Sequence, residues 1–155
     1  MSKPRRRSHR LLKFLIFCAL CAGFFWWSNH SLETERFTFA SPRLPEGFDG
    51  CVIVQLSDLH GALFGEENED LIAQVRSHRP DYIFLTGDLQ DRYRRTPRSY
   101  AVSLGRALAE IAPTYFVTGN HEWAFRDVRE LKRELRDAGV TVLTNEYVPL
   151  TRNGD

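Results

Sequence analysis

Three apolar segments of this chain each lead into residues that commonly bind metal ions, and this pattern constrains the fold more than any other feature. The segments are residues 51–54, 82–85 and 115–117, and the residues that follow them are Asp58 and His60, then Asp88, then Asn120 and His121. Asp58, Asp88 and Asn120 are spaced 30 and 32 residues apart. Each apolar segment has the length of a buried strand, so the pattern predicts three strands that end in polar, ligand-type residues.

Asp58 and His60 form the first of these groups, directly after the strand expected at residues 51–54. An extended chain points residues i and i+2 to the same side, so these two side chains are expected to converge. A carboxylate and an imidazole that converge are typical of a transition-metal site. Gly87 and Gly119 precede the other groups and are expected to let the backbone turn sharply.

Amphipathic segments alternate with the apolar ones. Helices are expected at residues 66–78, at residues 96–112 with Thr96 as the N-cap, and at residues 125–138, and a fourth strand is expected at residues 140–143. Strands that alternate with helices in this way predict a βαβαβαβ unit with a mostly parallel sheet and right-handed crossovers. Ligands of such sheets bind beyond the carboxyl ends of the strands, where all three polar groups fall.

The N-terminal segment differs in composition from the rest. The first 13 residues carry six basic side chains and no acidic one, whereas the whole chain has a net charge of +1. The remainder is therefore mildly acidic, and nucleic acid is not an expected partner. The prolines and glycines at positions 42, 45 and 47 predict a tether over residues 28–49, in which residues 37–39 alternate like a short edge strand.

Residues 11–27 are apolar apart from Lys13 and predict one transmembrane signal-anchor helix. The expected organisation is a basic cytoplasmic segment at residues 1–10, the anchor at 11–27, the tether at 28–49 and a partial catalytic domain at 50–155. The basic flank places the domain on the extracytoplasmic side of the cell membrane. The alternative is a cleaved signal peptide and export, which the aromatic run at residues 24–27 disfavours.

The segments S-D-L-H-G at 57–61, T-G-D-L at 86–89 and T-G-N-H-E at 118–122 together resemble the calcineurin-like metallophosphoesterases. The N-terminal anchor is similar to that of their membrane-associated bacterial phosphodiesterase branch. The resemblance covers residues 50–145 and implies the N-terminal half of a two-sheet α/β sandwich, preceded by the transmembrane helix. It also implies hydrolysis of phosphoric esters by two divalent ions, which vary among Mn, Fe, Zn, Ni and Mg.

The resemblance assigns a role to each motif residue. Asp58 and His60 hold the first metal, Asp88 bridges both metals, Asn120 binds the second, and His121 contacts the scissile phosphate or protonates the leaving group. A shared carboxylate offsets the repulsion between two close cations. A neutral amide oxygen binds a cation without cancelling its charge, and a histidine beside the metals is suited to proton donation.

The chain departs from the family beyond His121, because no histidine follows it although the family supplies further histidine ligands there. We therefore expect the N-terminal portion of a larger hydrolase, with impaired activity in this chain. One alternative is an inactive, membrane-anchored binding module that keeps half the metal site. Another is an unrelated nucleotide-binding domain, which the lack of a glycine-rich loop after the first strand disfavours. The anchor predicts a phosphoester substrate near lipid headgroups, such as a lipid-linked diester.

Overall fold

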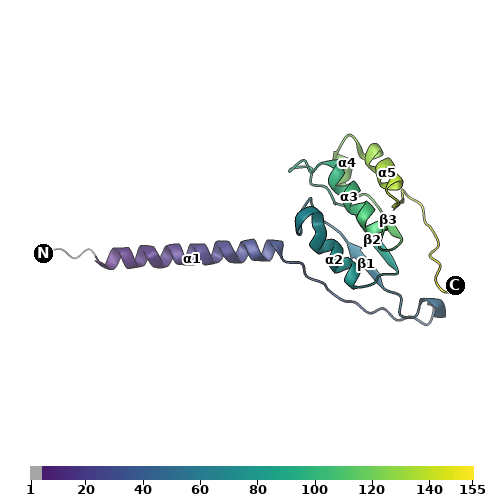
Figure 1. Ribbon diagram of the computed structural model, residues 1–155, viewed down its shortest axis with the longest axis horizontal. Coiled ribbons are helices and arrows are strands. Elements are labelled where there is room, and N and C mark those ends of the chain that lie inside the picture. Colours follow the sequence, from purple (N-terminus) through teal and green to yellow (C-terminus); the bar gives the residue numbers. More distant parts are fainter. Residues whose placement is uncertain (1–4) are drawn as a thin grey trace. The chain divides into compact units, whose positions relative to one another are not determined.

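The computed structural model describes residues 5–155, apart from the side chains of residues 5–8, 26, 27, 29 and 30. The basic charges expected at residues 3 and 5–7 and the aromatic side chains of Trp26 and Trp27 therefore lie outside the described residues. The chain forms two compact units, Met1–Glu35 and Arg36–Asp155. Figure 1 shows a single helix in the first unit and an α/β fold in the second.

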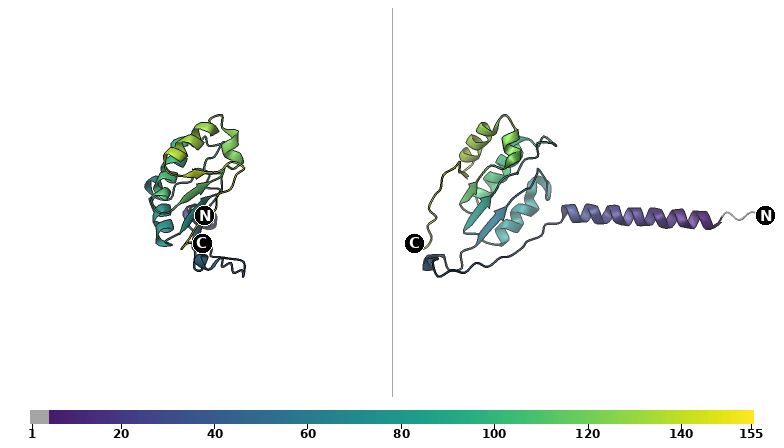
Figure 2. Two further views of the ribbon diagram at one scale, coloured as in Figure 1. Left: turned by 90° about the vertical axis from the view of Figure 1, so that its right-hand side faces the viewer. Right: turned by 180° about the vertical axis from the view of Figure 1, so that it is seen from behind.

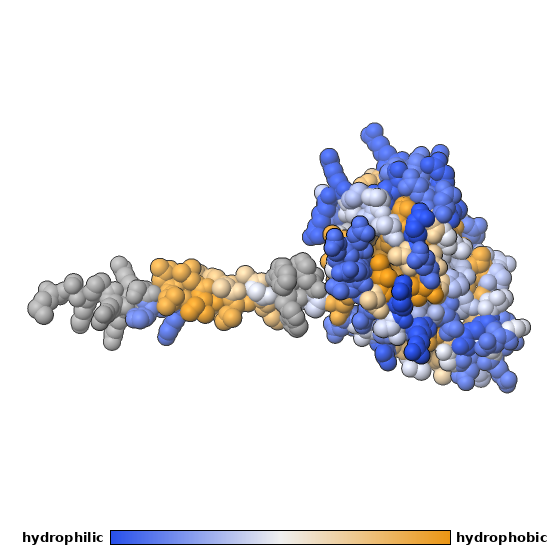
Figure 3. Space-filling view, viewed as in Figure 1, coloured by the Kyte–Doolittle hydropathy of each residue, from blue (hydrophilic) through white to orange (hydrophobic). Residues whose placement is uncertain are grey.

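The first unit consists of α1, Arg5–His30. Its described apolar side chains are exposed, and they form the orange segment of this helix in Figure 3. Within the described part of the chain, no helix combines the length and the apolar character that crossing a membrane requires. The predicted transmembrane helix is thus not found.

The second unit is built on a parallel sheet of four strands in the order β1-β2-β3-β4. The strands are β1 (Ile53–Leu56), β2 (Tyr82–Leu85), β3 (Thr114–Phe116) and β4 (Thr141–Val142). Neighbouring strands pair in parallel, with Gln55, Phe84, Tyr115 and Thr141 in one row across the sheet. The predicted βαβαβαβ parallel sheet is confirmed. The second sheet that the family resemblance implied is not present in the described residues.

Three longer helices cover one face of this sheet. They are α2 (Glu69–Ser77), α3 (Arg98–Ala109) and α5 (Val128–Asp137), and the short helix α4 (Asn120–Ala124) precedes α5. The helices lie in front of the strands in Figure 1, and the strands lie in front in the reversed view of Figure 2. Single-turn 3-10 helices occur at Glu46–Phe48 and Glu66–Asn68.

The hydrophobic core lies between the helices and the covered face of the sheet. Ile83, Leu85 and Phe116 of the central strands are almost completely buried there. They meet Leu104 and Leu108 of α3, which are buried to the same extent. The apolar stripe of the helix thus packs against the alternating side chains of the strands and forms one core layer, as expected for an α/β fold.

The structure corrects several local expectations. The first strand is an edge strand and not a buried one: 48% of Ile53 is exposed, because β1 has one strand neighbour and helices cover only one face. Residues 37–39 form no strand. The cap of α3 is Pro97 and not Thr96. The Thr96 hydroxyl instead accepts the backbone N–H of Asp91 at 3.1 Å.

A polar clamp closes the edge of the sheet at which the strands begin. The Asp81 carboxylate accepts the backbone N–H of Val52 at 2.8 Å and the Nε–H of Arg152 at 3.0 Å. Arg152 also donates to the carbonyl oxygens of Gly47 and Asp49. The C-terminal segment is thereby joined to the residues before β1. The hydrogen bond from Val52, and then that from Arg152, hold the pKa of Asp81 below its usual range.

Asp81→Asn should destabilise the second unit by about 1 kcal/mol at pH 7, because a partly exposed carboxylate loses its charge-assisted bonds. The folded-state pKa lies below the unfolded value of about 3.9, so this stability is present above that value and is lost as the pH falls through the folded pKa. The free energies of unfolding of the wild type and the variant, measured with urea, should therefore approach each other as the pH falls below about 4. Asp49→Asn, at an exposed side chain, is the control. If the wild type and Asp81→Asn differed in free energy of unfolding by the same amount at pH 3 and at pH 7, the clamp would be contradicted.

Candidate metal centre

The polar groups that follow β1, β2 and β3 meet at the carboxyl edge of the sheet. One ligand atom each from His60, Asp88 and His121 lies within 4.8 Å of the others. The rings of His60 and His121 meet edge to face, with centroids 4.5 Å apart. These three residues are far apart in sequence, and the parallel order of the strands is what brings them together.

The loop after β1 continues the pairing with β2 beyond the ends of the strands. The backbone N–H groups of Asp58 and His60 donate to the carbonyl oxygens of Gly87 and Asp88 at 3.1 and 2.9 Å. The backbone is not extended here, as the sequence argument assumed: φ is 56° at Asp58 and 49° at His60. Their side chains nevertheless face each other, with Asp58 Oδ1 3.7 Å from His60 Nε2. The expected convergence is present, but left-handed backbone produces it.

Asp88 occupies the centre of the group. Its side chain is buried, and its backbone is also left-handed, with φ of 52°. Oδ1 accepts the backbone N–H of His121 at 2.8 Å, which links the loop after β2 to the start of α4. Unfavourable backbone angles of this kind persist where surrounding contacts enforce them, and they cluster at functional sites.

Glu122 is the residue that enforces this arrangement. Its side chain is completely buried, and its two carboxylate oxygens accept three backbone N–H groups. Oε2 accepts those of Asp88 and Gly119, each at 2.8 Å, and Oε1 accepts that of Gln90 at 3.0 Å. One carboxylate therefore joins the loops that follow β2 and β3. Glu122 ends the T-G-N-H-E motif, and the sequence alone assigned it no function.

The two glycines are needed for different reasons. Gly87 has φ of 101°, which favours glycine, as the sequence predicted. Gly119 has φ of −88° and ψ of −174°, which any residue adopts. Its constraint is close approach: a Cβ atom there would lie 2.2 Å from Asp88 Oδ1 and 2.6 Å from the Asp88 backbone nitrogen. The prediction of a sharp turn is therefore wrong for Gly119.

His121 is held by the loop that follows Asp88. Its Nδ1 accepts the backbone N–H of Arg92 at 3.2 Å and lies 3.6 Å from Asp91 Oδ1. In the neutral ring this contact leaves the proton on Nε2. His121 thus lies within the ligand group, with its Nδ1 held by this loop.

Asp91 is a residue of the site that the sequence analysis did not identify. Its side chain is largely buried beside His121. Burial alone would raise the pKa of Asp91, but the backbone N–H groups of Tyr93 and Arg94, together with the charges of His121 and Arg94, hold it below its usual range. The carboxylate form is therefore stable next to the histidine.

Asn120 is the first residue of α4 and is exposed, one position before His121. Its neighbour Gly119 packs directly against Asp88. The backbone of Asn120 is thus placed at the same edge of the sheet as the other motif residues. Its assignment to a second metal remains a prediction.

The donor set fits a divalent metal ion. Two ligand atoms about 2.1 Å from one ion are separated by at most about 4 Å, and Asp58 Oδ1 and His60 Nε2 meet this condition at 3.7 Å. His60 Nδ1 is buried and has no hydrogen-bond partner among the described residues. Carboxylate, imidazole and amide groups are the ligands of Mn, Fe, Zn and Mg ions in proteins.

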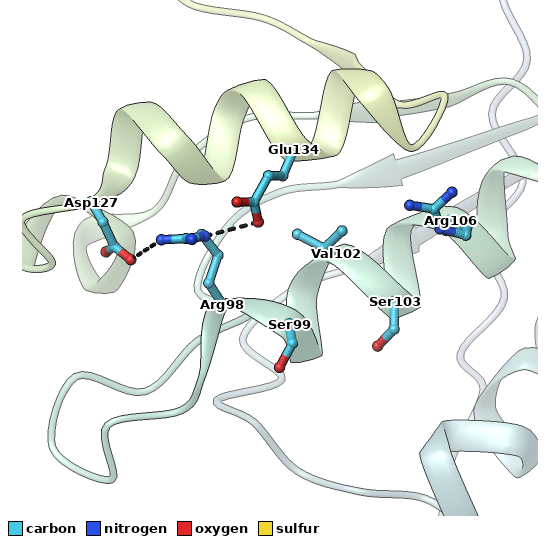
Figure 4. A pocket seen from close by; sticks show the side chains of 7 residues that line it. All are labelled: Arg98, Ser99, Val102, Ser103, Arg106, Asp127 and Glu134. Carbon is cyan, nitrogen blue, oxygen red and sulfur yellow. Dashed lines mark hydrogen bonds and ion pairs between the residues drawn. The ribbon is translucent and has the colours of Figure 1, made fainter.

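A separate pocket lies between α3 and α5. Figure 4 shows Arg98 reaching from α3 toward two acidic side chains. It donates to Asp127 at 2.5 Å and to Glu134 at 2.8 Å. These charges satisfy one another, so the groove is explained as an ion-paired contact between two helices.

Comparison with known proteins assigns the chain to a protein family. The family described as calcineurin-like phosphoesterase matches residues 51–154, and the chain belongs to the calcineurin-like metallophosphoesterase family. It is therefore a member of a hydrolase family that uses metal ions. The membrane-associated bacterial branch suggested by the sequence is not established by this match.

Several curated proteins are similar to the chain. A "Transmembrane protein with metallophosphoesterase domain" of Bos taurus is 35% identical over 114 residues, which cover 72% of this chain and 26% of that protein. The protein of the same name from Danio rerio is 32% identical, over 71% of this chain and 25% of that protein. The "Uncharacterized metallophosphoesterase YkuE" of Bacillus subtilis (strain 168) is 32% identical over 79% of this chain and 44% of its own length.

The chain spans from a quarter to less than half of the length of these relatives. No solved structure matches it.

Proposed function

We propose that this chain forms part of a two-metal centre that hydrolyses phosphoric esters. Asp58 and His60 would hold one divalent ion, Asp88 would be shared, and Asn120 would hold the second. The observation that carries the proposal is the convergence of His60, Asp88 and His121 within 4.8 Å at the carboxyl edge of a parallel sheet. Family membership supports the same reaction class.

A bound pair of divalent ions would supply charge stabilisation for phosphate and an activated water molecule at neutral pH. The chain's own residues complete the chemistry. With Nδ1 accepting the Arg92 N–H, the neutral His121 ring would carry its proton on Nε2 and would donate a hydrogen bond from there to an oxygen of the scissile phosphate. The Asp91 carboxylate stands beside Nδ1 and would help to hold the ring in this position.

A metal-binding module without turnover is the second candidate. It requires only the ligand group of His60, Asp88 and His121. A phosphoester substrate near lipid headgroups, such as a lipid-linked diester, stays part of the proposal.

Calorimetric titration with Mn²⁺ tests the metal centre directly. We expect measurable binding to the wild-type chain and a loss of about 100-fold or more in Asp88→Asn, which removes the charge but keeps an oxygen for the His121 N–H. Asp137→Asn, at an exposed position of α5, removes the same charge away from the site and should bind as the wild type does. Absence of Mn²⁺ binding by the wild-type chain would refute the proposal.

Hydrolysis of bis-p-nitrophenyl phosphate then separates the two candidates. Weak turnover that requires Mn²⁺ and disappears in Asp88→Asn supports a hydrolase whose ligand set is incomplete in these residues. Mn²⁺ binding without turnover supports the module. Turnover that survives Asp88→Asn would place the chemistry at another site.

A further inference from the structure

A loop of four exposed residues, Arg92, Tyr93, Arg94 and Arg95, stands beside the candidate metal centre. We name residues 92–95 the arginine loop. Its base is closed by hydrogen bonds between its flanking residues. The Thr96 N–H donates to the Asp91 carbonyl oxygen, and the Asp91 N–H donates to the Thr96 hydroxyl, both at 3.1 Å. The arginine loop therefore projects from a fixed base.

The arginine loop is in direct contact with His121. The Arg92 backbone N–H donates to Nδ1 of His121 at 3.2 Å, and the ring of Tyr93 meets the His121 ring edge to face, with centroids 5.8 Å apart. The Tyr93 N–H is in turn bound by Asp91 Oδ1 at 2.8 Å. A phosphate bound at His121 would thus lie beside the arginine loop.

The charges of the arginine loop are largely uncompensated. Arg94 lies 3.6 Å from Asp91, whereas Arg92 and Arg95 take part in no ion pair with any other residue that the structure describes. The Arg92 guanidinium lies 4.5 Å from the centroid of the Tyr93 ring and donates one Nη2–H to the Tyr93 hydroxyl. These contacts hold the planar group in place, and its other N–H groups are available to a ligand. Guanidinium groups in such positions bind phosphate oxygens in pairs.

We propose that Arg92 and Arg95 bind a second phosphate of the substrate, so that the site prefers esters that carry another phosphate near the scissile one. This inference rests on the proposed function for the position of the first phosphate. The proposed function specifies the hydrolysis of phosphoric esters but not the rest of the substrate. The inference names a substrate class, which is compounds that carry two phosphates.

Two sugar phosphates that differ by one phosphate test the inference. Glucose 1,6-bisphosphate and glucose 1-phosphate are titrated calorimetrically into the full chain, with Mn²⁺ bound and without metal, at constant ionic strength. The bisphosphate should bind about tenfold more tightly than the monophosphate, and this preference should fall below about threefold in the double variant Arg92→Gln, Arg95→Gln. Both side chains are exposed, so the variant is expected to fold, which its thermal midpoint checks.

The control removes two positive charges at the opposite edge of the sheet. Arg76 and Arg106 lie in the last turns of α2 and α3, and Arg76→Gln, Arg106→Gln should keep the preference. The inference would be overturned if the wild type and the Arg92/Arg95 variant showed the same ratio of bisphosphate to monophosphate affinity. It would also be overturned if the control variant lost the preference equally, because that would indicate general charge attraction. Failure of Mn²⁺ to bind would instead refute the proposed metal centre, and the metal-free ratio would still decide the role of the arginine loop.

Discussion

Replacing Glu122 by glutamine is expected to lower the free energy of unfolding of the second unit by about 2–4 kcal/mol. The carboxylate is buried and accepts N–H groups from Asp88, Gln90 and Gly119. An amide has one oxygen and one NH₂ group, so at least one of the three backbone N–H groups would face another donor. A buried donor without a partner costs about 1–3 kcal/mol, and more where a charged acceptor is lost.

The same substitution should weaken Mn²⁺ binding by about tenfold or more, because the backbone of Asp88 is one of the groups that Glu122 holds. Urea unfolding and calorimetry measure the two effects. Glu130→Gln is the matched control, since Glu130 is exposed on α5 and should change stability by less than about 0.5 kcal/mol. A Glu122→Gln chain with wild-type stability and metal affinity would show that the carboxylate does not organise the site.

Gly119→Ala is expected to damage both the stability of the second unit and the metal centre. The added Cβ would lie 2.2 Å from Asp88 Oδ1 and 2.6 Å from the Asp88 nitrogen, so the backbone itself must move. Such overpacking costs about 1–3 kcal/mol and at times more. Because the displaced group is Asp88, Mn²⁺ affinity should fall together with stability.

Gly23→Ala makes the same chemical change on α1, where a Cβ would meet nothing within 4 Å. It should leave the unfolding of the second unit and its Mn²⁺ affinity unchanged. Thermal unfolding and metal titration of both variants provide the comparison. A Gly119→Ala chain that binds Mn²⁺ as the wild type does would mean that the two loops can separate without consequence.

Strand β2 was predictable because residues 82–85 are an uninterrupted apolar run, and β2 occupies those residues between two neighbouring strands. The same reasoning failed for the burial of the apolar run at residues 51–54, which leads into β1 at an edge of the sheet. An apolar run indicates a strand, whereas its burial depends on which elements cover it, and that is a property of the tertiary structure.

The motif residues were predictable, but the groups that hold them were largely not. Asp58, Asp88 and His121 follow apolar strands, which is a local signal. Asp91 acts through a buried contact with His121, and nothing in its neighbourhood of exposed arginines indicates burial. Glu122 had one available signal, a glutamate three residues after the residue that precedes a helix, which is the pattern of a capping box.

Asp58, His60 and Asp88 share backbone angles that side-chain-bearing residues rarely adopt. Each such angle raises the energy of the folded chain, and glycine or asparagine would relieve it at these positions. Selection for stability alone would therefore remove the ligand groups from this sheet edge and leave the sheet intact. Three of the nine described non-glycine residues with positive φ thus lie at the edge of the sheet where the metal centre is proposed, and a more stable chain would be obtained there only by giving up the proposed ligands.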